Sequence, residues 1–418
     1  MTASPPVVEV RGAPATSLET PEAHTATSAI AAATQLAATF AEGSALRDRE
    51  RILPVAEVEA LSASGLLALT VPVEYGGPGL GAAVLAEVVR LIATGDPNIA
   101  QIPHSHFVYV NAILEQGTEE QKAFLLGEVL AGKRFGNAQS EIGSKHVRDH
   151  ATTLRRDALV NGDWVLDGEK GYCTGALFAH WIPVLAHLGE GGPLHVAWVE
   201  RDAEGVTVID DWNGLGQRTT ASGTVRLAGV RVASDRITPY HLTFERPQAY
   251  GSFAQLLHAA IDAGIARAAL RDAAAFVTTR SRPYPDAITL YDVAGAAEDP
   301  LVVRAFGEIE LQVRGAEALL AEAGRAVDRA RADLTDETAA DASLAVAAAR
   351  AATTAASLEA ASRLFEVAGT RSALATDNLD RHWRNARTHT LHDPAAWKVQ
   401  HLGRFAIDGT LPPRNGQI

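Results

Sequence analysis

The sequence pattern changes twice along the chain, and this change constrains the fold more than any single motif. From about residue 26 to 133, apolar residues follow a helical spacing in alanine-rich stretches. Between about 135 and 246 the chain becomes a series of short segments rich in β-branched and aromatic residues, separated by Asn-Gly, Asp-Gly and Gly-Gly pairs that favour turns. From about residue 253 the helical spacing returns. The sequence therefore predicts a small β domain between two helical regions.

Individual elements can be placed within this outline. Thr118 can cap the start of a helix, and Gln121, three residues later, can complete a capping box with it. Four strands are predicted at 164–168, 181–185, 195–199 and 224–227. An apolar strip for packing one helix on another is formed by Val302, Phe306, Ile309, Val313, Ala316 and Leu320. A long alanine-rich helix is expected from about 336 to 367. These strips fit a bundle within one subunit or between subunits, and both arrangements remain open.

The predicted fold class is α+β, with four segments. Residues 1–25 mix Pro, Ala, Thr and Glu without a basic start and an apolar block, so they form a flexible tail rather than a signal peptide. An N-terminal helical domain is expected at 26–133, a middle β-barrel or sandwich at 134–246, and a C-terminal four-helix bundle at 247–418.

Composition limits the possible partners and the compartment. With 37 basic and 50 acidic residues the formal net charge is −13, which argues against a nucleic acid or an anionic membrane as the main partner. No apolar run reaches membrane-spanning length. The single cysteine, Cys173, excludes an internal disulfide and fits a reducing cytoplasm.

Two histidines near the end of the chain carry the chemistry. His389 and His392 are three residues apart, so on a helical turn both imidazoles face the same side. Pro394 ends any helix there, because the residue before a proline is pushed out of the α region. Imidazole titrates near neutrality and can give or take a proton. A capped helix end is the alternative interpretation, and a metal site is not expected because adjacent His392 and Asp393 cannot easily converge on one ion.

Four motifs, in order, resemble those of the acyl-CoA dehydrogenase superfamily along nearly the whole length after residue 40. They lie at 65–79 (Gly-Leu to Val-Pro and Gly-Gly-x-Gly), 117–122, 162–170 and 214–222. The dehydrogenases need a glutamate base to remove a proton beside the thioester carbonyl. Neither of the two places where that family carries it, 388–394 and 256–264, holds a glutamate here, and within 256–264 the only carboxylate is Asp262.

The Arg-Asn-x-Arg-Thr-His-x-x-His-Asp-Pro corner instead resembles the flavin-dependent monooxygenases of this superfamily, typified by dibenzothiophene monooxygenase. The segments 174–181 and 216–224 look most like sulfur-acquisition oxidoreductases of sulfone-utilising bacteria. This resemblance implies a cytoplasmic homotetramer that receives reduced FMN from a separate NAD(P)H-dependent reductase. It implies that O2 then forms a flavin hydroperoxide, which passes one oxygen atom to an organosulfur substrate. FMN is favoured over FAD.

The same resemblance implies particular site residues. For proton transfer these are His389, His392 and His106, with His106 preferred over its rival His104 as the histidine that faces the flavin. Thr174 is expected near the reacting flavin nitrogen, and Asn137 and Ser140 at the flavin edge. For the FMN phosphate, across a subunit interface, the expected cations are Arg280, Arg282 and Arg371.

Two other functions stay open from sequence. The first is an acyl-CoA dehydrogenase type of FAD enzyme with Asp262 or Asp393 as an unusual base. The second is a flavin-free, non-catalytic relative. A loop at 282–300, rich in Pro and Tyr, is the expected lid that selects the substrate.

Overall fold

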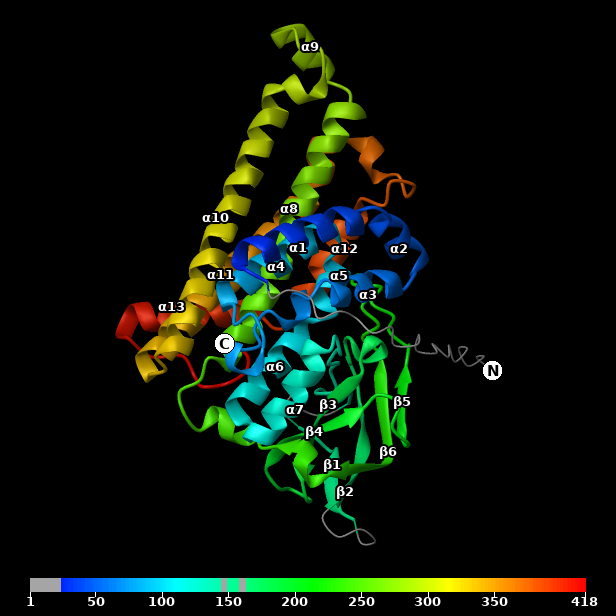
Figure 1. Cartoon of the computed structure of the whole chain (residues 1–418). Coiled ribbons are helices and arrows are strands. Elements are labelled where there is room, and N and C mark those ends of the chain that lie inside the picture. The colour runs from blue at the N-terminus through cyan, green and yellow to red at the C-terminus, as the bar shows by residue number, and fades with distance from the viewer. Residues whose placement is uncertain (1–23, 144–148, 158–162) are drawn as a thin grey trace.

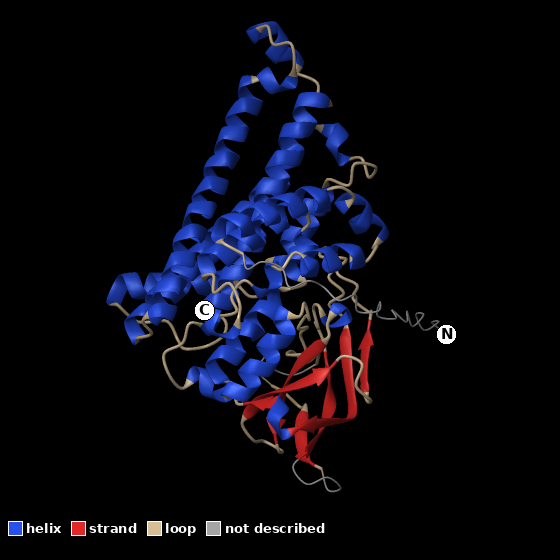
Figure 2. Ribbon diagram, viewed as in Figure 1, coloured by secondary structure: helices blue, strands red, loops and turns tan. Residues whose placement is uncertain are grey.

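The computed structural model describes residues 24–143, 149–157 and 163–418. Helices make up most of the molecule, and the strands gather at one end of it (Figure 2). The predicted order of helical, β and helical regions is confirmed (Figure 1). The predicted tail lies outside the described residues except for its last two positions. No helix within the described ranges is both long and apolar enough to cross a membrane.

The N-terminal region is a set of helices with short 3-10 turns. Its elements are α1 (Ala26–Ala41), α2 (Ser44–Glu50), α3 (Val55–Ala63), η1 (Leu66–Ala68), η2 (Val73–Tyr75), α4 (Ala82–Gly95), α5 (Pro97–Gln101), α6 (His104–Gln116) and α7 (Glu119–Leu130). The predicted capping box at the start of α7 is confirmed. The backbone N–H of Gln121 donates to Thr118 Oγ1 at 3.3 Å, and Gln121 Oε1 accepts from the backbone N–H of Thr118 at 2.9 Å.

The middle region forms one seven-stranded sheet in the order β5-β6-β2-β1-β3-β4-β7. Neighbouring strands are antiparallel except β1 and β3. The strands are β1 (Thr153–Arg156), β2 (Asp163–Lys170), β3 (Trp181–Leu188), β4 (Leu194–Glu200), β5 (Val206–Ile209), β6 (Thr224–Ala233) and β7 (Ile237–Thr238), with 3-10 turns η3 (Ala176–Phe178), η4 (Ser234–Arg236) and η5 (Tyr240–Phe244). All four predicted strands are confirmed. Gly162, the first residue of the third motif, lies outside the described residues.

The C-terminal region is built on three long helices. Its elements are α8 (Tyr250–Thr279), α9 (Pro285–Tyr291), η6 (Ala296–Glu298), α10 (Pro300–Ala332), α11 (Asp336–Ala368), η7 (Thr370–Ala373), α12 (Asp380–His389) and α13 (Ala395–Asp408). The predicted apolar strip lies on α10, where Ile309, Val313 and Ala316 are buried in a cluster with residues of α8 and α11. The long alanine-rich helix is confirmed as α11.

The expectation of a loop at 282–300 is wrong. Pro285 occupies the first turn of α9, where its missing N–H costs nothing and its fixed φ suits a helix. Within one chain, α9 sits at the tip beyond α8 and α10, at the opposite end of the molecule from the sheet (Figure 1).

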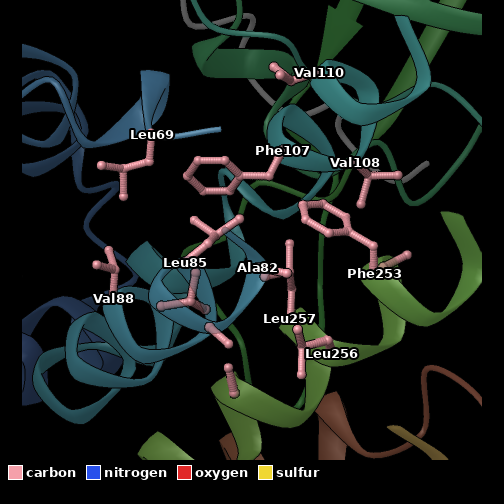
Figure 3. Packing of buried hydrophobic residues seen from close by; sticks show 14 of the residues in the cluster. Leu69, Ala82, Leu85, Val88, Phe107, Val108, Val110, Phe253, Leu256 and Leu257 are labelled. Carbon is pink, nitrogen blue, oxygen red and sulfur yellow. The ribbon is translucent and has the colours of Figure 1, made fainter. Parts of the chain in front are cut away.

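One hydrophobic core joins the N-terminal helices to α8. Figure 3 shows Phe107 and Val108 of α6 among side chains of α4 and α8, including Leu85 and Phe253. These four side chains are at most 6% exposed, and burying a side chain of this size stabilises the fold by about 1.5–3 kcal/mol. This packing fixes the rotation of α6 about its axis and therefore decides which of its polar side chains face α8.

Candidate active site

Four imidazoles meet where α6, α8 and α12 converge. The ring of His258 on α8 stacks on that of His104, with ring centroids 3.9 Å apart, and on its other side lies His392 at 4.0 Å. His389 lies 5.2 Å from the same ring. His389 is the last residue of α12 and Pro394 is the N-cap of α13, so the corner has the helix end that the sequence predicts. His258 is the centre of the cluster.

His389 is held through both of its ring nitrogens. Its Nδ1 lies 2.6 Å from Asp262 Oδ1, and its Nε2 lies 3.1 Å from His258 Nδ1. Gln101 Oε1 is 3.2 Å from the same Nε2. An ionised carboxylate can only accept, so Nδ1 of His389 carries a hydrogen. In neutral His389, Nε2 then accepts the Nδ1–H of His258.

Asp262 is fully buried and acts as a counter-ion. It forms an ion pair with Arg350 and accepts a hydrogen bond from Thr354 Oγ1 at 3.2 Å. Burial raises the pKa of Asp262, but the charge of Arg350 and the bond to His389 outweigh it, so its pKa is lowered. Asp262 is therefore ionised and fully occupied by its partners.

Asp393 is engaged in the same way. Its Oδ2 lies 2.6 Å from Lys398 Nζ, and its Oδ1 lies 3.5 Å from Arg350 and 3.4 Å from His392 Nδ1. Burial raises the pKa of Asp393, but the bond to His392 and the charges of Arg350 and Lys398 hold it well below its usual range. Arg350 thus contacts both of the carboxylates that bond His389 and His392.

Burial keeps the inner imidazoles neutral. It lowers the pKa of His104 to about 3 and that of His258 well below its ordinary value. Burial also lowers the pKa of His389, although Asp262 opposes the effect. His104, His258 and His392 meet through their ring faces, so their nitrogen lone pairs do not point at a common centre. Among the described residues, no group of three or more His, Cys, Asp or Glu side chains is arranged to hold a metal ion.

The structure does not bring His106 into this cluster. Its Nε2–H donates to the carbonyl of Leu67 at 3.0 Å, and its Nδ1 accepts the N–H of Phe135 at 3.1 Å. Burial lowers its pKa to about 4. Side chains two residues apart on a helix point in directions about 200° apart. Helix α6 can therefore direct only one of His104 and His106 toward α8. This packing places His104, and not His106, beside His258; that His106 faces the flavin stays a prediction.

A loop of the β domain docks beside the histidine corner. The backbone N–H of Gly216 donates to Thr388 Oγ1 at 2.9 Å, and that of Gln217 donates to Asn385 Oδ1 at 2.7 Å. A Cβ at position 216 would lie 2.0 Å from the carbonyl oxygen of Arg384, so only glycine fits this contact. The fourth sequence motif is therefore the part of the β domain that touches α12.

Predicted flavin-contacting residues line the neighbouring turn. The Thr174 and Ser222 hydroxyls are 2.6 Å apart, and Ser222 is 2.8 Å from the Thr220 hydroxyl. Asn137 Nδ2 donates to the carbonyl of Tyr172 at 3.3 Å. The carbonyl of Ser140 accepts the N–H of Gly171 at 2.9 Å. Asn137 and Ser140 thus lie along the 171–174 turn that carries Thr174.

Several buried polar atoms in these loops fit a polar ligand. Within the described part of the chain, no hydrogen-bond partner exists for Asn137 Oδ1, Thr219 Oγ1, or the Oε1 and Nε2 atoms of Gln217. Leaving such an atom unpaired costs about 1–3 kcal/mol, so these atoms mark a place for donors and acceptors from outside the chain. The mixture of free donors and acceptors suits the polar edge of a flavin ring, so the residues present fit that group.

The predicted phosphate-binding arginines lie together but far from the imidazoles of the same chain. Arg371 Nη1 donates to the carbonyl of Arg280 at 3.0 Å, Arg280 pairs with Asp377, and Arg282 is exposed. Arg280 follows His258 by 22 residues at the end of α8, which is about 33 Å of helix. One chain therefore does not bring these arginines and the histidine cluster into one pocket.

Sequence reasoning missed His258, Gln101 and Arg350. His258 and Asp262 are four apart on α8 and share a face, a spacing that was available in the sequence. Arg350 is the only charged residue in an otherwise small and apolar stretch of α11, which is a second usable signal. Nothing local indicates Gln101, because its role depends on where α5 meets α12.

Comparison with known families agrees with the fold. Residues 25–133 match the family "Acyl-CoA dehydrogenase, N-terminal domain", and residues 256–396 match "Acyl-CoA dehydrogenase, C-terminal domain". The second match contains most of α8, the corner with His389 and His392, and the start of α13.

Individual relatives extend over most of the chain. Dibenzothiophene monooxygenase of Rhodococcus erythropolis is 34% identical over 382 residues, covering 88% of this chain and 90% of that protein. A probable FMNH2-dependent monooxygenase of Pseudomonas putida is 32% identical over 392 residues, covering 92% and 96%. The crystal structure of FMN-bound TdsC from a Paenibacillus species superposes with a TM-score of 0.86 at 33% identity, covering 94% and 100%. The chain therefore belongs to the acyl-CoA dehydrogenase superfamily, in its branch of flavin-dependent monooxygenases.

Proposed function

We propose that this protein is a two-component monooxygenase that uses reduced FMN and O2 to transfer one oxygen atom to an organosulfur compound. The similarity to a dibenzothiophene monooxygenase and to an FMN-bound structure supports the substrate class and the cofactor. Similarity to a probable FMNH2-dependent enzyme supports the use of reduced FMN delivered by a separate reductase.

The occupied carboxylates are the observation that carries this proposal. A dehydrogenase base must be a carboxylate that is free to take a proton from carbon. Asp262 and Asp393 are instead bound by Arg350, Lys398 and the imidazoles, with pKa values lowered by these partners. A carboxylate held in its charged form by such partners is a poor base. The site has imidazoles where a dehydrogenase has a glutamate. Imidazoles suit the transfer of protons to and from oxygen atoms.

The residues around the proposed flavin position have distinct roles. Bound reduced FMN supplies two electrons and the activation of O2. Thr174 would hold the reacting side of the bound ring through its hydroxyl, and Asn137 and Ser140 would hold the ring edge. His392, whose side chain is 51% exposed, gives or takes a proton at Nε2, while Asp393 orients it through Nδ1. His104 takes the role expected of His106.

The arginines require a second copy of the chain. Arg280, Arg282 and Arg371 would bind the FMN phosphate of a neighbouring subunit, because in its own chain Arg280, which Arg371 contacts, lies about 33 Å along α8 from His258. A forked guanidinium suits phosphate oxygens. A homotetramer is the assembly we infer from the family resemblance. A cytoplasmic location is inferred from the single cysteine and from the supply of reduced flavin by an NAD(P)H-dependent partner.

The test is oxygen transfer under 18O2. The protein would be mixed with FMN, an NADH-dependent flavin reductase and either dibenzothiophene or dimethyl sulfone as substrate. One 18O atom per turnover in the sulfur product is the expected result. Bleaching of tightly bound FAD by an acyl-CoA, without any reductase, would instead establish a dehydrogenase.

The His392→Ala variant assigns the role of the corner. We expect FMN affinity within about twofold of wild type and product formation reduced by about a hundredfold, the usual contribution of one acid–base group. His187→Ala, in β3 of the sheet domain, is the control and should keep full activity. Full product yield from His392→Ala would refute the assigned role.

A further inference from the structure

His258 has no role in the function proposed so far, yet it is the centre of the cluster. Its ring lies between His104 and His392, and its Nδ1 is hydrogen-bonded to His389 Nε2 at 3.1 Å. Its Nε2 has no hydrogen-bond partner among residues 24–143, 149–157 and 163–418. His258 is 1% exposed, so its ring is almost completely enclosed. A buried imidazole with one nitrogen committed and one free is placed to pass a proton inward.

The hydrogen positions follow from the partners. Asp262 fixes a hydrogen on Nδ1 of His389, which leaves Nε2 of neutral His389 as an acceptor. His258 therefore carries its hydrogen on Nδ1, and its Nε2 has a free lone pair. Asp262, His389 and His258 thus form a hydrogen-bonded chain that ends at the lone pair on Nε2 of His258.

We propose that His258 and His389 form a two-imidazole proton relay that ends at Asp262, with Asp262 acting as the positioning residue that holds the received proton on His389. This inference rests on the proposed function, in which oxygen acids form and disappear at the site. In the forward step Nε2 of His258 takes a proton from a bound oxygen acid, while the proton on its Nδ1 moves to Nε2 of His389. The oxygen acid becomes an oxyanion and His389 becomes an imidazolium. The reverse step returns the proton, so the relay is reset.

Of the two relay imidazoles, His389 is the one with a carboxylate at its ring, although burial still lowers its pKa. Asp262 lies at its Nδ1, and Gln101 Oε1 lies 3.2 Å from Nε2, ready to accept the added hydrogen. His258 has no carboxylate at either nitrogen. The ring centroids of His258 and His389 lie 5.2 Å apart, and two imidazolium rings this close would repel each other, so the pair can keep only one added proton. The paired position, His389, is the place for it.

The charged and titratable groups around His389 come from several elements. From α8 they are His258 and Asp262, from α11 Arg350, from α6 His104, and from the turn after α12 His392. Arg350 and His392 oppose a charge on His389, whereas Asp262 favours it. Burial also opposes it. Asp262 is thus the group whose removal should change the titration of His389 most.

The decisive experiment titrates His389 in the flavin-free protein. The 14 histidines would be labelled with 13C at Cε1 in a deuterated background, and the His389 resonance assigned through His389→Gln. In Asp262→Asn we expect the pKa of His389 to fall by about one to three units relative to wild type, because an opposite charge is removed at contact distance. Asp272→Asn is the matched control. Asp272 lies on α8 like Asp262, and its carboxylate bonds His382 of α12. Its removal should leave the His389 titration unchanged.

An unchanged His389 pKa in Asp262→Asn would overturn the positioning role, whatever the enzyme oxidises. This readout needs no flavin and no substrate, so failure of the relay and failure of the proposed function can be told apart. Asn at 262 leaves Arg350 with only the more distant Asp393, and this variant can therefore fail to fold.

His258→Gln tests the relay without changing a charged residue. We expect product formation to fall by about a hundredfold, FMN affinity to change by less than about twofold, and His389 to titrate nearly as in wild type. The pH profile should also lose its acid-side fall in product formation within the measured range, because His389 no longer exchanges its proton with the site. Wild-type rates with a wild-type pH profile in His258→Gln would contradict the relay.

Discussion

Helices α8 and α12 carry two carboxylate–imidazole pairs of the same composition and opposite behaviour. Near one end, Asp262 bonds His389 and is paired with Arg350. Ten residues further along α8, Asp272 bonds His382 at 2.8 Å and pairs with Arg381 at 2.5 Å. Both pairs join the same two helices. They differ in the use of the second imidazole nitrogen and in access to water.

The second nitrogen decides whether such a pair can act. His389 uses it to contact His258 and Gln101, whereas His382 makes no hydrogen bond to another imidazole within the described part of the chain. The Asp262 side chain is 0% exposed and that of Asp272 is 19% exposed. The Asp272 pair therefore fastens α12 to α8, while the Asp262 pair also has an outlet into the site. Identical residue types give a clamp in one place and a relay in the other.

The largest expected contrast is in stability. Arg350→Met leaves Asp262 buried without its cation, which costs about 3–5 kcal/mol. Arg381→Met leaves Asp272 partly exposed and still bonded to His382, so it should cost about 1 kcal/mol or less. Urea midpoints at one fixed protein concentration measure both losses. Equal shifts of the urea midpoint in the two variants would show that losing Arg350 from its buried pair costs no more stability than losing Arg381.

The next contrast is in activity. His389→Gln should reduce product formation by about a hundredfold, because the proton received by His258 then has no acceptor. His382→Gln removes a fastening contact remote from the stack and should change the rate by less than about twofold. Steady-state rates at saturating reduced FMN separate these outcomes. A large loss in His382→Gln at unchanged stability would remove the functional distinction between the pairs.

Acid sensitivity gives a third contrast. The pKa of folded His258 lies well below its ordinary value, so unfolding takes up a proton as the pH falls below about 6.5, and stability is lost in that direction. His258→Gln should flatten this loss between about pH 6.5 and 5 by up to about 1.4 kcal/mol per pH unit. His382→Gln should flatten it less, since Asp272 offsets part of the burial that lowers the pKa of His382. Thermal midpoints measured at several pH values test this ranking.

The smallest contrast compares a threonine hydroxyl of α12 with one of α8. Thr388→Val removes the acceptor for the N–H of Gly216 and should cost about 1 kcal/mol, seen as roughly fivefold weaker FMN binding in a fluorescence titration. Thr278→Val on α8 removes a hydroxyl that bonds only carbonyls of its own helix and serves as the control. Unchanged FMN affinity in Thr388→Val would mean that the docked loop does not depend on this end of α12.

The sequence predicted elements best where the pattern was long. The strip on α10 was found because a helical spacing repeats from Val302 to Leu320, and α11 was found from its long run of alanine and other small residues. Strands β1, β5 and β7 were missed, since two to four residues are too few to show an alternation. The lid was wrongly expected to be a loop because the helix-starting position of Pro285 was not recognised.

The site was predictable in kind but not in detail. The corner with His389 and His392 could be seen because both residues are close in sequence. The choice between His104 and His106 could not, because it depends on how Phe107 and Val108 seat α6 against α4 and α8. His258 becomes significant only when α12 is placed beside α8, and this placement is a property of the tertiary structure.

Helix α8 has a mechanical consequence of its own. It is one continuous rod of 30 residues with the relay imidazole near one end and Arg280 at the other. In an assembly where Arg280 binds the phosphate of a neighbour, each rod would connect the proton-handling end of one subunit to the cofactor of the next. A displacement at one site would then be transmitted along the axis to another, and occupancy of neighbouring subunits would be coupled.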